Sequence, residues 1–305
     1  MRNDARHPSL GRALPVAQRR LDAANTPRLQ YGITHVQEVH VKTALQDFTG
    51  MPVPEPTWSL NPYLGCAHRC TYCYVPDTLQ AERHRWGRYV ILKRNLPTVL
   101  ARELATKTPG RVYLSTATDP YQPTEAEHRI TRACLDRIAR RQWPLDVLTR
   151  SPLVLRDLDL LVDIDARVGL SVPTLDDGLR AILEPAAPPI DARLDTLHRL
   201  ADAGLTTYAN LAPLQPPSNG YTAQDVAQTF AELNVAWVNA AHWIRLPTVL
   251  PVVAAHARDT PYADLPRIVQ NKQAMVQVEQ DLQDAFDAIG LPLHRGFFNP
   301  PAPPP

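Results

Sequence analysis

Short apolar runs alternate with amphipathic stretches along most of the chain after residue 56. The apolar runs are three to six residues long and predict buried strands. We predict six of them, at Thr57–Asn61, Val112–Leu114, Leu145–Thr149, Val168–Val172, Thr206–Leu211 and Val235–Asn239.

Between these runs, apolar side chains recur at helical spacing. Asn95 can cap a helix that carries Leu96, Val99 and Leu104 on one face. Further helices are predicted over Glu125–Arg141, from Ser151 onward, from Ile190 to a stop at Gly204, and over Leu265–Ile289. Alternation of this kind indicates an α/β fold with a parallel sheet and right-handed crossovers, although six units are too few to close an eight-stranded barrel.

Composition divides the chain into a core with flanking extensions. We expect a poorly ordered basic arm at 1–30, an N-terminal extension at 31–56, a barrel at 57–240, a helical extension at 241–298 and a proline-rich tail at 299–305.

The net charge and the number of cysteines limit the classes of function that the protein can have. The formal net charge is +1, so no global basic field points to non-specific DNA binding. Only four cysteines occur and three are clustered, which is typical of a reducing compartment. Residues 1–28 lack the apolar run of a secretory signal, and no later stretch approaches the roughly 20 apolar residues of a membrane span. We therefore expect a cytoplasmic protein.

The clustered cysteines are Cys66, Cys70 and Cys73, on the loop after the first predicted strand. Three thiols cannot all pair, and a disulfide across so short a loop would be strained. Three thiolates can instead hold an iron–sulfur cluster, and a four-iron cluster would then keep one iron free to bind another molecule. The alternative is a structural zinc site completed by His68 or a remote histidine. Zinc ligands usually come as two separated pairs, and no second pair follows here.

Polar residues also mark the ends of the next three predicted strands. Thr116, Thr118 and Asp119 offer oxygen acceptors for an ammonium group, and Arg150 could hold a carboxylate. Ser171 could meet a ribose or a carboxylate. The simpler alternatives are an Asp-Pro turn, a surface arginine and a capping serine. For Glu125 we prefer a structural role at a helix start.

Several motifs together resemble one known family. They are Asn61-Pro62-Tyr63, the cysteine loop with Tyr72 before its third cysteine, Thr118 to Pro123, Leu148 to Pro152 with Arg156-Asp157, and Leu183-Glu184-Pro185. Over about residues 55 to 215 they resemble the radical S-adenosylmethionine (radical SAM) superfamily. Within it, they resemble the spore photoproduct lyase-like group, which includes "DNA repair photolyase"-like proteins.

The resemblance implies a partial (β/α)6 TIM-like barrel with a [4Fe-4S] cluster on the three cysteines. It also implies S-adenosylmethionine (SAM), with its amine at the end of the second strand, its carboxylate on Arg150, and its carboxylate or ribose on Ser171. The backbone around Tyr72 would meet the adenine. Such enzymes take an electron from a donor such as flavodoxin or ferredoxin, cleave SAM reductively to a 5′-deoxyadenosyl radical, and abstract hydrogen from a substrate.

The substrate stays open at this point. Spore photoproduct lyase repairs a DNA lesion and uses a fourth cysteine near the second strand end as hydrogen donor. Here the fourth cysteine is Cys134, between Ile130 and Ile138 on a predicted helix, which we interpret as core. A DNA or RNA lesion, a peptide or small molecule, and a non-catalytic nucleic-acid-binding module with structural zinc are the alternatives. Four aromatic residues could form a base-stacking surface, although we expect at least half of them to be packing residues: Tyr63, Tyr74, Tyr121 and Trp243.

Overall fold

The computed structural model describes residues 35–47, 57–114 and 116–296. The arm predicted at 1–30, part of the 31–56 extension and the tail at 299–305 lie outside these residues. No helix in the described part is long and apolar enough to cross a membrane.

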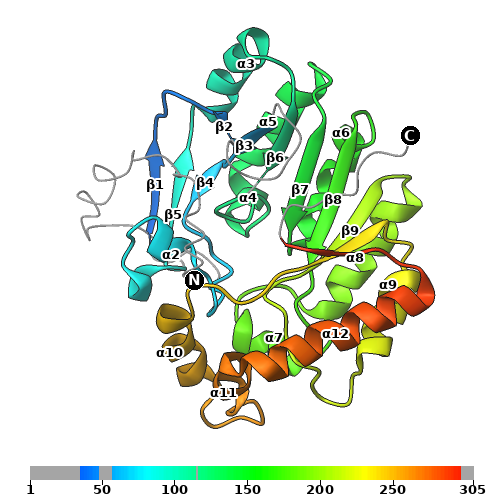
Figure 1. Ribbon diagram of the computed structural model, residues 1–305. Coiled ribbons are helices and arrows are strands. Elements are labelled where there is room, and N and C mark those ends of the chain that lie inside the picture. Colours follow the sequence, from blue (N-terminus) through cyan, green and yellow to red (C-terminus); the bar gives the residue numbers. More distant parts are fainter. Residues whose placement is uncertain (1–34, 48–56, 115, 297–305) are drawn as a thin grey trace.

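Six parallel strands form the centre of the main sheet (Figure 1). In spatial order they are β3 (Thr57–Leu60), β6 (Arg111–Leu114), β7 (Leu145–Thr149), β8 (Ala166–Ser171), β9 (Thr206–Leu211) and β10 (Trp237–Ala240). Each predicted strand is present, with ends shifted by no more than two residues. The order confirms the predicted α/β partial barrel of six β/α units. Two short strands extend its edges: β2 (Gln46–Asp47) pairs antiparallel with β3, and β11 (Leu293–Arg295) pairs parallel with β10.

Several predicted helices are present with different bounds. α3 spans Leu96–Thr106 and α8 spans Ile190–Asp202. Asn95 stands at the start of α3, but the prediction that its side chain caps this helix is wrong. Instead, its amide exchanges hydrogen bonds with the backbone of Val41 at 2.8 and 2.9 Å.

Two helices predicted as continuous are broken. The first is split into α4 (Thr124–His128) and α5 (Ile130–Ala139), because Arg129 adopts left-handed backbone with φ 50°. The last is split into α11 (Leu265–Gln270) and α12 (Lys272–Ile289), because Asn271 is extended and its side chain caps α12. After Ser151 the chain forms a 3₁₀ segment, η3 (Pro152–Asp157), and then α6 (Leu158–Leu161).

A second, three-stranded sheet lies beside the barrel and was not predicted. It has the order β1 (His35–Val39), β5 (Tyr89–Lys93), β4 (Tyr63–Leu64). The cysteine loop follows β4, and α2 (Val75–Thr78) and the 3₁₀ segment η2 (Arg83–Arg85) lead on to β5. The loop therefore begins at the carboxyl end of the first barrel strand and is backed by its own small sheet (Figure 1).

The remaining helices follow the last three barrel strands in the chain and pack around the barrel. α7 (Asp177–Leu183) follows β8, and α9 (Ala223–Glu232) follows β9. α12, the long orange helix of Figure 1, packs against α9. α10 (Leu246–Ala257) lies next to α2, where Thr248 donates a hydrogen bond to Asp77.

The barrel interior is arranged in rows set by strand register. Gly169, Tyr208 and Trp237 pair across β8, β9 and β10, and the Tyr208 and Trp237 rings stack with centroids 4.8 Å apart. A Cβ at position 169 would lie 2.2 Å from the Tyr208 ring, so only glycine leaves room there. The Tyr208 hydroxyl donates to buried Asp146 at 2.6 Å. The row above, nearer the carboxyl ends, is Ser171, Asn210 and Asn239.

Candidate active site

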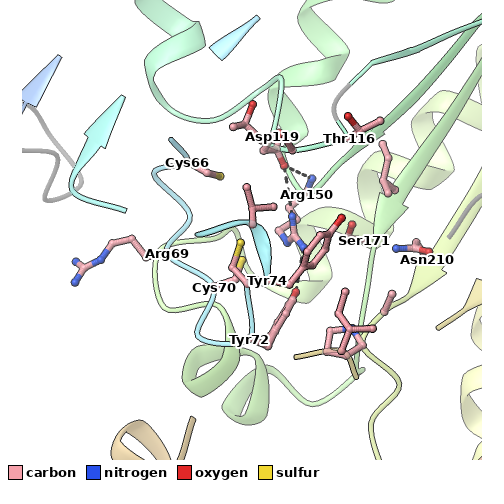
Figure 2. A pocket seen from close by; sticks show the side chains of 18 of the residues that line it. Cys66, Arg69, Cys70, Tyr72, Tyr74, Thr116, Asp119, Arg150, Ser171 and Asn210 are labelled. Carbon is pink, nitrogen blue, oxygen red and sulfur yellow. Dashed lines mark hydrogen bonds and ion pairs between the residues drawn. The ribbon is translucent and has the colours of Figure 1, made fainter. Parts of the chain in front are cut away.

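A cavity of about 130 Å³ opens at the carboxyl ends of the barrel strands. Figure 2 shows Cys66 and Cys70 on one side of it, and Ser171 and Asn210 on the opposite side. Barrel enzymes carry their chemistry at this end. All nine residues predicted as ligands line this one cavity: Cys66, Cys70, Cys73, Tyr72, Thr116, Thr118, Asp119, Arg150 and Ser171.

The three cysteines are free thiols in a desolvated setting. Burial raises the pKa of each of them to about 12, because a thiolate loses its hydration there. Thiols in this state are inert as bare nucleophiles, and binding a metal is what deprotonates them. The donor set therefore suits metal ligation.

Backbone contacts from distant segments fix the cysteine loop. The Gln122 side chain accepts from the Ala67 amide at 2.9 Å and donates to the Gly65 carbonyl at 3.1 Å. Gly65 has φ 81°, and a Cβ there would lie 2.3 Å from the Tyr89 carbonyl. The Thr71 amide donates to the Leu183 carbonyl at 2.8 Å. The loop conformation is thus set by residues of three other segments.

His68 is one candidate for the fourth ligand in the alternative zinc site, and its ring already has partners. Nε2 lies 3.3 Å from an Asp119 oxygen and Nδ1 lies 3.4 Å from the Ala186 carbonyl. In the part of the chain that the structure describes, no three Cys, His, Asp or Glu side chains are grouped to hold a single metal ion. Each cysteine of an iron–sulfur cluster binds an iron of its own, so a cluster does not require three side chains grouped around one ion. The arrangement therefore gives the zinc alternative no support.

Asp119 is a structural hub of the cavity wall. Its two oxygens accept from the Tyr121 amide, the Thr149 hydroxyl and the Arg150 amide, at 2.7 to 2.9 Å. Burial opposes its charge, but His68, Arg150 and Thr149 outweigh burial and lower the pKa of Asp119 to about 2. The carboxylate is ionised and already satisfied by protein groups.

The hydroxyl groups of Thr116 and Thr118 differ in how many hydrogen bonds they can still accept. Thr116 Oγ1 hydrogen bonds with the Ser59 hydroxyl and the Asn61 amide, both at 2.9 Å. Thr118 makes a longer contact of 3.4 Å to the Tyr63 carbonyl, as a donor, which leaves its lone pairs available.

Arg150 belongs to a buried charge network. Its Nε donates to Glu184 at 2.7 Å, and its Nη2 donates to the Tyr72 hydroxyl at 3.0 Å. That hydroxyl donates in turn to Glu184, which also pairs with buried Arg193 at 2.5 Å. The network links the cysteine loop, the end of β7 and the segment after α7. From the sequence, Glu184 stands out only as part of the Leu183-Glu184-Pro185 motif, and this role was missed.

The aromatic prediction divides as expected. Tyr63 donates to Glu125 and Tyr121 is fully buried, so both are packing residues. Tyr74 and Trp243 line the cavity, and Trp243 meets the Tyr72 ring edge-on at 6.0 Å.

Glu125 is structural, as preferred from the sequence. Its carboxylate accepts from the Thr131 and Arg132 amides at the start of α5 and pairs with Arg156 at 2.6 Å. Cys134 is likewise fully buried in the core.

A comparison with protein families decides the classification. Residues 60–230 match the radical SAM superfamily, which is more than half of the chain. The chain belongs to the radical SAM superfamily. Members of this superfamily use a [4Fe-4S] cluster and SAM, and the chemistry of the side chains that line the cavity suits both. Three thiols face it from the loop, and a guanidinium and two hydroxyls stand at the strand ends.

Relatives of this radical SAM protein include uncharacterised proteins. One from Methanocaldococcus jannaschii is 33% identical over 166 residues, covering 54% of this chain and 62% of the relative. One from Acidianus two-tailed virus is 31% identical over 173 residues, covering 53% of this chain and 57% of the relative. The matches thus span about three-fifths of these curated relatives.

Among solved structures, the radical SAM fold of this chain is similar to that of spore photoproduct lyase. A lyase variant with bound AdoMet and dinucleoside spore photoproduct has a TM-score of 0.64 at 16% identity, covering 87% of this chain and 83% of that one. The lyase complexed with dinucleoside spore photoproduct gives 0.63 at 16% identity, covering 86% and 82%. At this identity the similarity concerns the fold.

Proposed function

We propose that this protein is a radical SAM enzyme that cleaves SAM reductively and removes hydrogen from a substrate bound in the same cavity. The observation that carries the proposal is the convergence of Cys66, Cys70 and Cys73 with Arg150 and Ser171 on one cavity at the carboxyl end of the barrel. When bound, the cluster and SAM supply one-electron cleavage of a carbon–sulfur bond.

The protein's part is to hold and orient these groups. The three thiols ligate the cluster, and the Arg150 guanidinium offers its remaining N–H groups to the SAM carboxylate. Thr118 is the best candidate for the SAM amine, because Asp119 and Thr116 are occupied by protein partners. Ser171 lines the cavity where a ribose or carboxylate can meet its hydroxyl.

For the substrate we propose a modified base in a nucleic acid, reached outside the base stack. The bound lesion in the similar lyase structure and the aromatic wall of Tyr74 and Trp243 support this choice. The lyase's cysteine donor has no counterpart in Cys134, which is buried in the core. The hydrogen donor, and with it the reaction outcome, therefore differs from lyase chemistry in our proposal.

The test is anaerobic. The protein is reconstituted with iron and sulfide, reduced, supplied with SAM and assayed for 5′-deoxyadenosine, with and without damaged oligonucleotides. We expect product from the wild type and none from Cys66→Ala, Cys70→Ala or Cys73→Ala. Cys134→Ala is the matched control and should keep both cluster and product. A colourless protein that retains zinc and forms no product would overturn the proposal.

A further inference from the structure

Two buried carboxamides, Asn210 on the cavity wall and Asn239 on the adjacent strand, each have an amide oxygen that the described residues leave without a hydrogen bond. Asn210 and Asn239 are 2% and 3% exposed. Within the described residues, Oδ1 of each is buried without a hydrogen-bond partner. A buried acceptor without a partner is unfavourable, so such groups in native proteins call for an explanation.

Strand register places the two amides side by side. Asn210 on β9 pairs with Asn239 on β10, one row above the stacked pair Tyr208 and Trp237. Because side chains two apart along a strand share a face, both amides lie on the interior face of the barrel. Asn210 lines the cavity next to Ser171, as Figure 2 shows. Asn210 thus borders the cavity directly, and Asn239 lies beside it on the neighbouring strand.

The chemistry of this space points to a planar, uncharged ligand edge. A carboxamide presents a donor and an acceptor together and can pair bidentately with a base edge. Trp243 and Tyr74, also on the cavity, provide aromatic faces on which a base can stack.

We propose that Asn210 and Asn239 form the substrate-reading pair of this enzyme and bind the hydrogen-bonding edge of a nucleobase. This assignment rests on the proposed function and names the residues that would give it base specificity. The amides stay unpaired in the free protein because their partner is the substrate.

Two leucine substitutions test the assignment. Asn239→Leu and Asn210→Leu keep the branched shape and the number of heavy atoms of the side chain and remove its hydrogen bonding. Gln280→Ala, on the exposed face of α12, is the control. Binding of labelled single-stranded hexanucleotides is measured by fluorescence anisotropy in reconstituted protein with SAM, using four homopolymers and an abasic strand. SAM affinity and thermal unfolding are measured on the same proteins.

We expect at least one homopolymer to bind the wild type more tightly than the abasic strand does. Each leucine variant should bind that homopolymer about ten- to a hundred-fold more weakly than the wild type. The thermal midpoint should hold or rise, because an unpaired buried amide has been removed. Equal binding of base-bearing and abasic strands, or unchanged affinity in both variants, refutes the assignment. A lower thermal midpoint also refutes the assignment, because it means that the amides are structural. A loss of SAM affinity alone refutes it too, because it means that the amides bind the cofactor. The proposed function fails separately, if the wild type forms no 5′-deoxyadenosine.

Discussion

Replacing Glu184 by glutamine should destabilise the protein strongly, because this carboxylate compensates two guanidinium groups. Its side chain is fully buried, as is that of Arg193, and Arg150 is only 19% exposed. Among the described residues, the hydrogen bonds that Arg193 donates go to neutral carbonyls, those of Pro188 and Ser171. Removing one partner of a buried ion pair costs about 3–5 kcal/mol. Since glutamine keeps one acceptor oxygen, we expect about 3 kcal/mol, a large part of the roughly 5–15 kcal/mol typical of a whole protein.

Urea unfolding of the apoprotein, followed by tryptophan fluorescence, measures this loss. At a slope of about 3 kcal/mol per molar, the midpoint should fall by about 1 M. Glu82→Gln is the matched control, because Glu82 is 61% exposed and its pair with Arg85 is 3.6 Å long, so its effect should stay below about 1 kcal/mol. Adding Arg193→Met to Glu184→Gln should recover part of the stability. If Glu184→Gln unfolds within about 1 kcal/mol of wild type, the network does not hold the loop as described.

Three further outcomes follow from the same interior. Burial outweighs the Tyr208 hydrogen bond and raises the pKa of Asp146 to about 7, so folding stability should fall as pH rises from about 4 to about 7. Asp146→Asn should therefore raise the thermal midpoint at pH 8 and change it little at pH 4; an equal gain at both would contradict this. Gly169→Ala should cost about 1–3 kcal/mol in urea unfolding because its Cβ meets the Tyr208 ring, and a neutral result would show that the ring moves freely. Burial opposes the charge of Glu184 and Asp119, but Arg193 and Arg150 around Glu184, and His68 and Arg150 around Asp119, lower the pKa of each carboxyl to about 2. The stability that these carboxylates contribute should be present above about pH 4.5 and lost toward pH 2, and circular dichroism should show this acid transition flattened in Glu184→Gln.

The sequence predicted the barrel strands well because buried parallel strands are short apolar runs between turn residues. It predicted helix ends less well, since the breaks at Arg129 and Asn271 depend on single backbone conformations. The sheet of β1, β5 and β4 was missed because its paired strands lie far apart in the sequence and one of them, β4, is only two residues long.

The candidate site shows the same division. Cysteine spacing, polar residues after apolar runs and, for Tyr72, the family resemblance identified nine residues that line one cavity. The sequence could not indicate that the Asp119 carboxylate accepts hydrogen bonds from Tyr121, Thr149 and Arg150, because those bonds depend on the tertiary structure. Asn210 was missed, although a polar amide near the end of an otherwise apolar strand was a usable signal.

The anchoring of the cysteine loop bears on how a damaged metal centre is restored. In a zinc finger the ion organises the fold, so losing the metal means unfolding. Here Thr71 and Tyr72 are tied to Leu183 and Glu184, more than a hundred residues away, by bonds that contain no metal. The apoprotein should therefore keep its loop shaped for the cluster. If oxygen destroys a cluster, the folded apoprotein should therefore be able to take up iron and sulfide again without refolding.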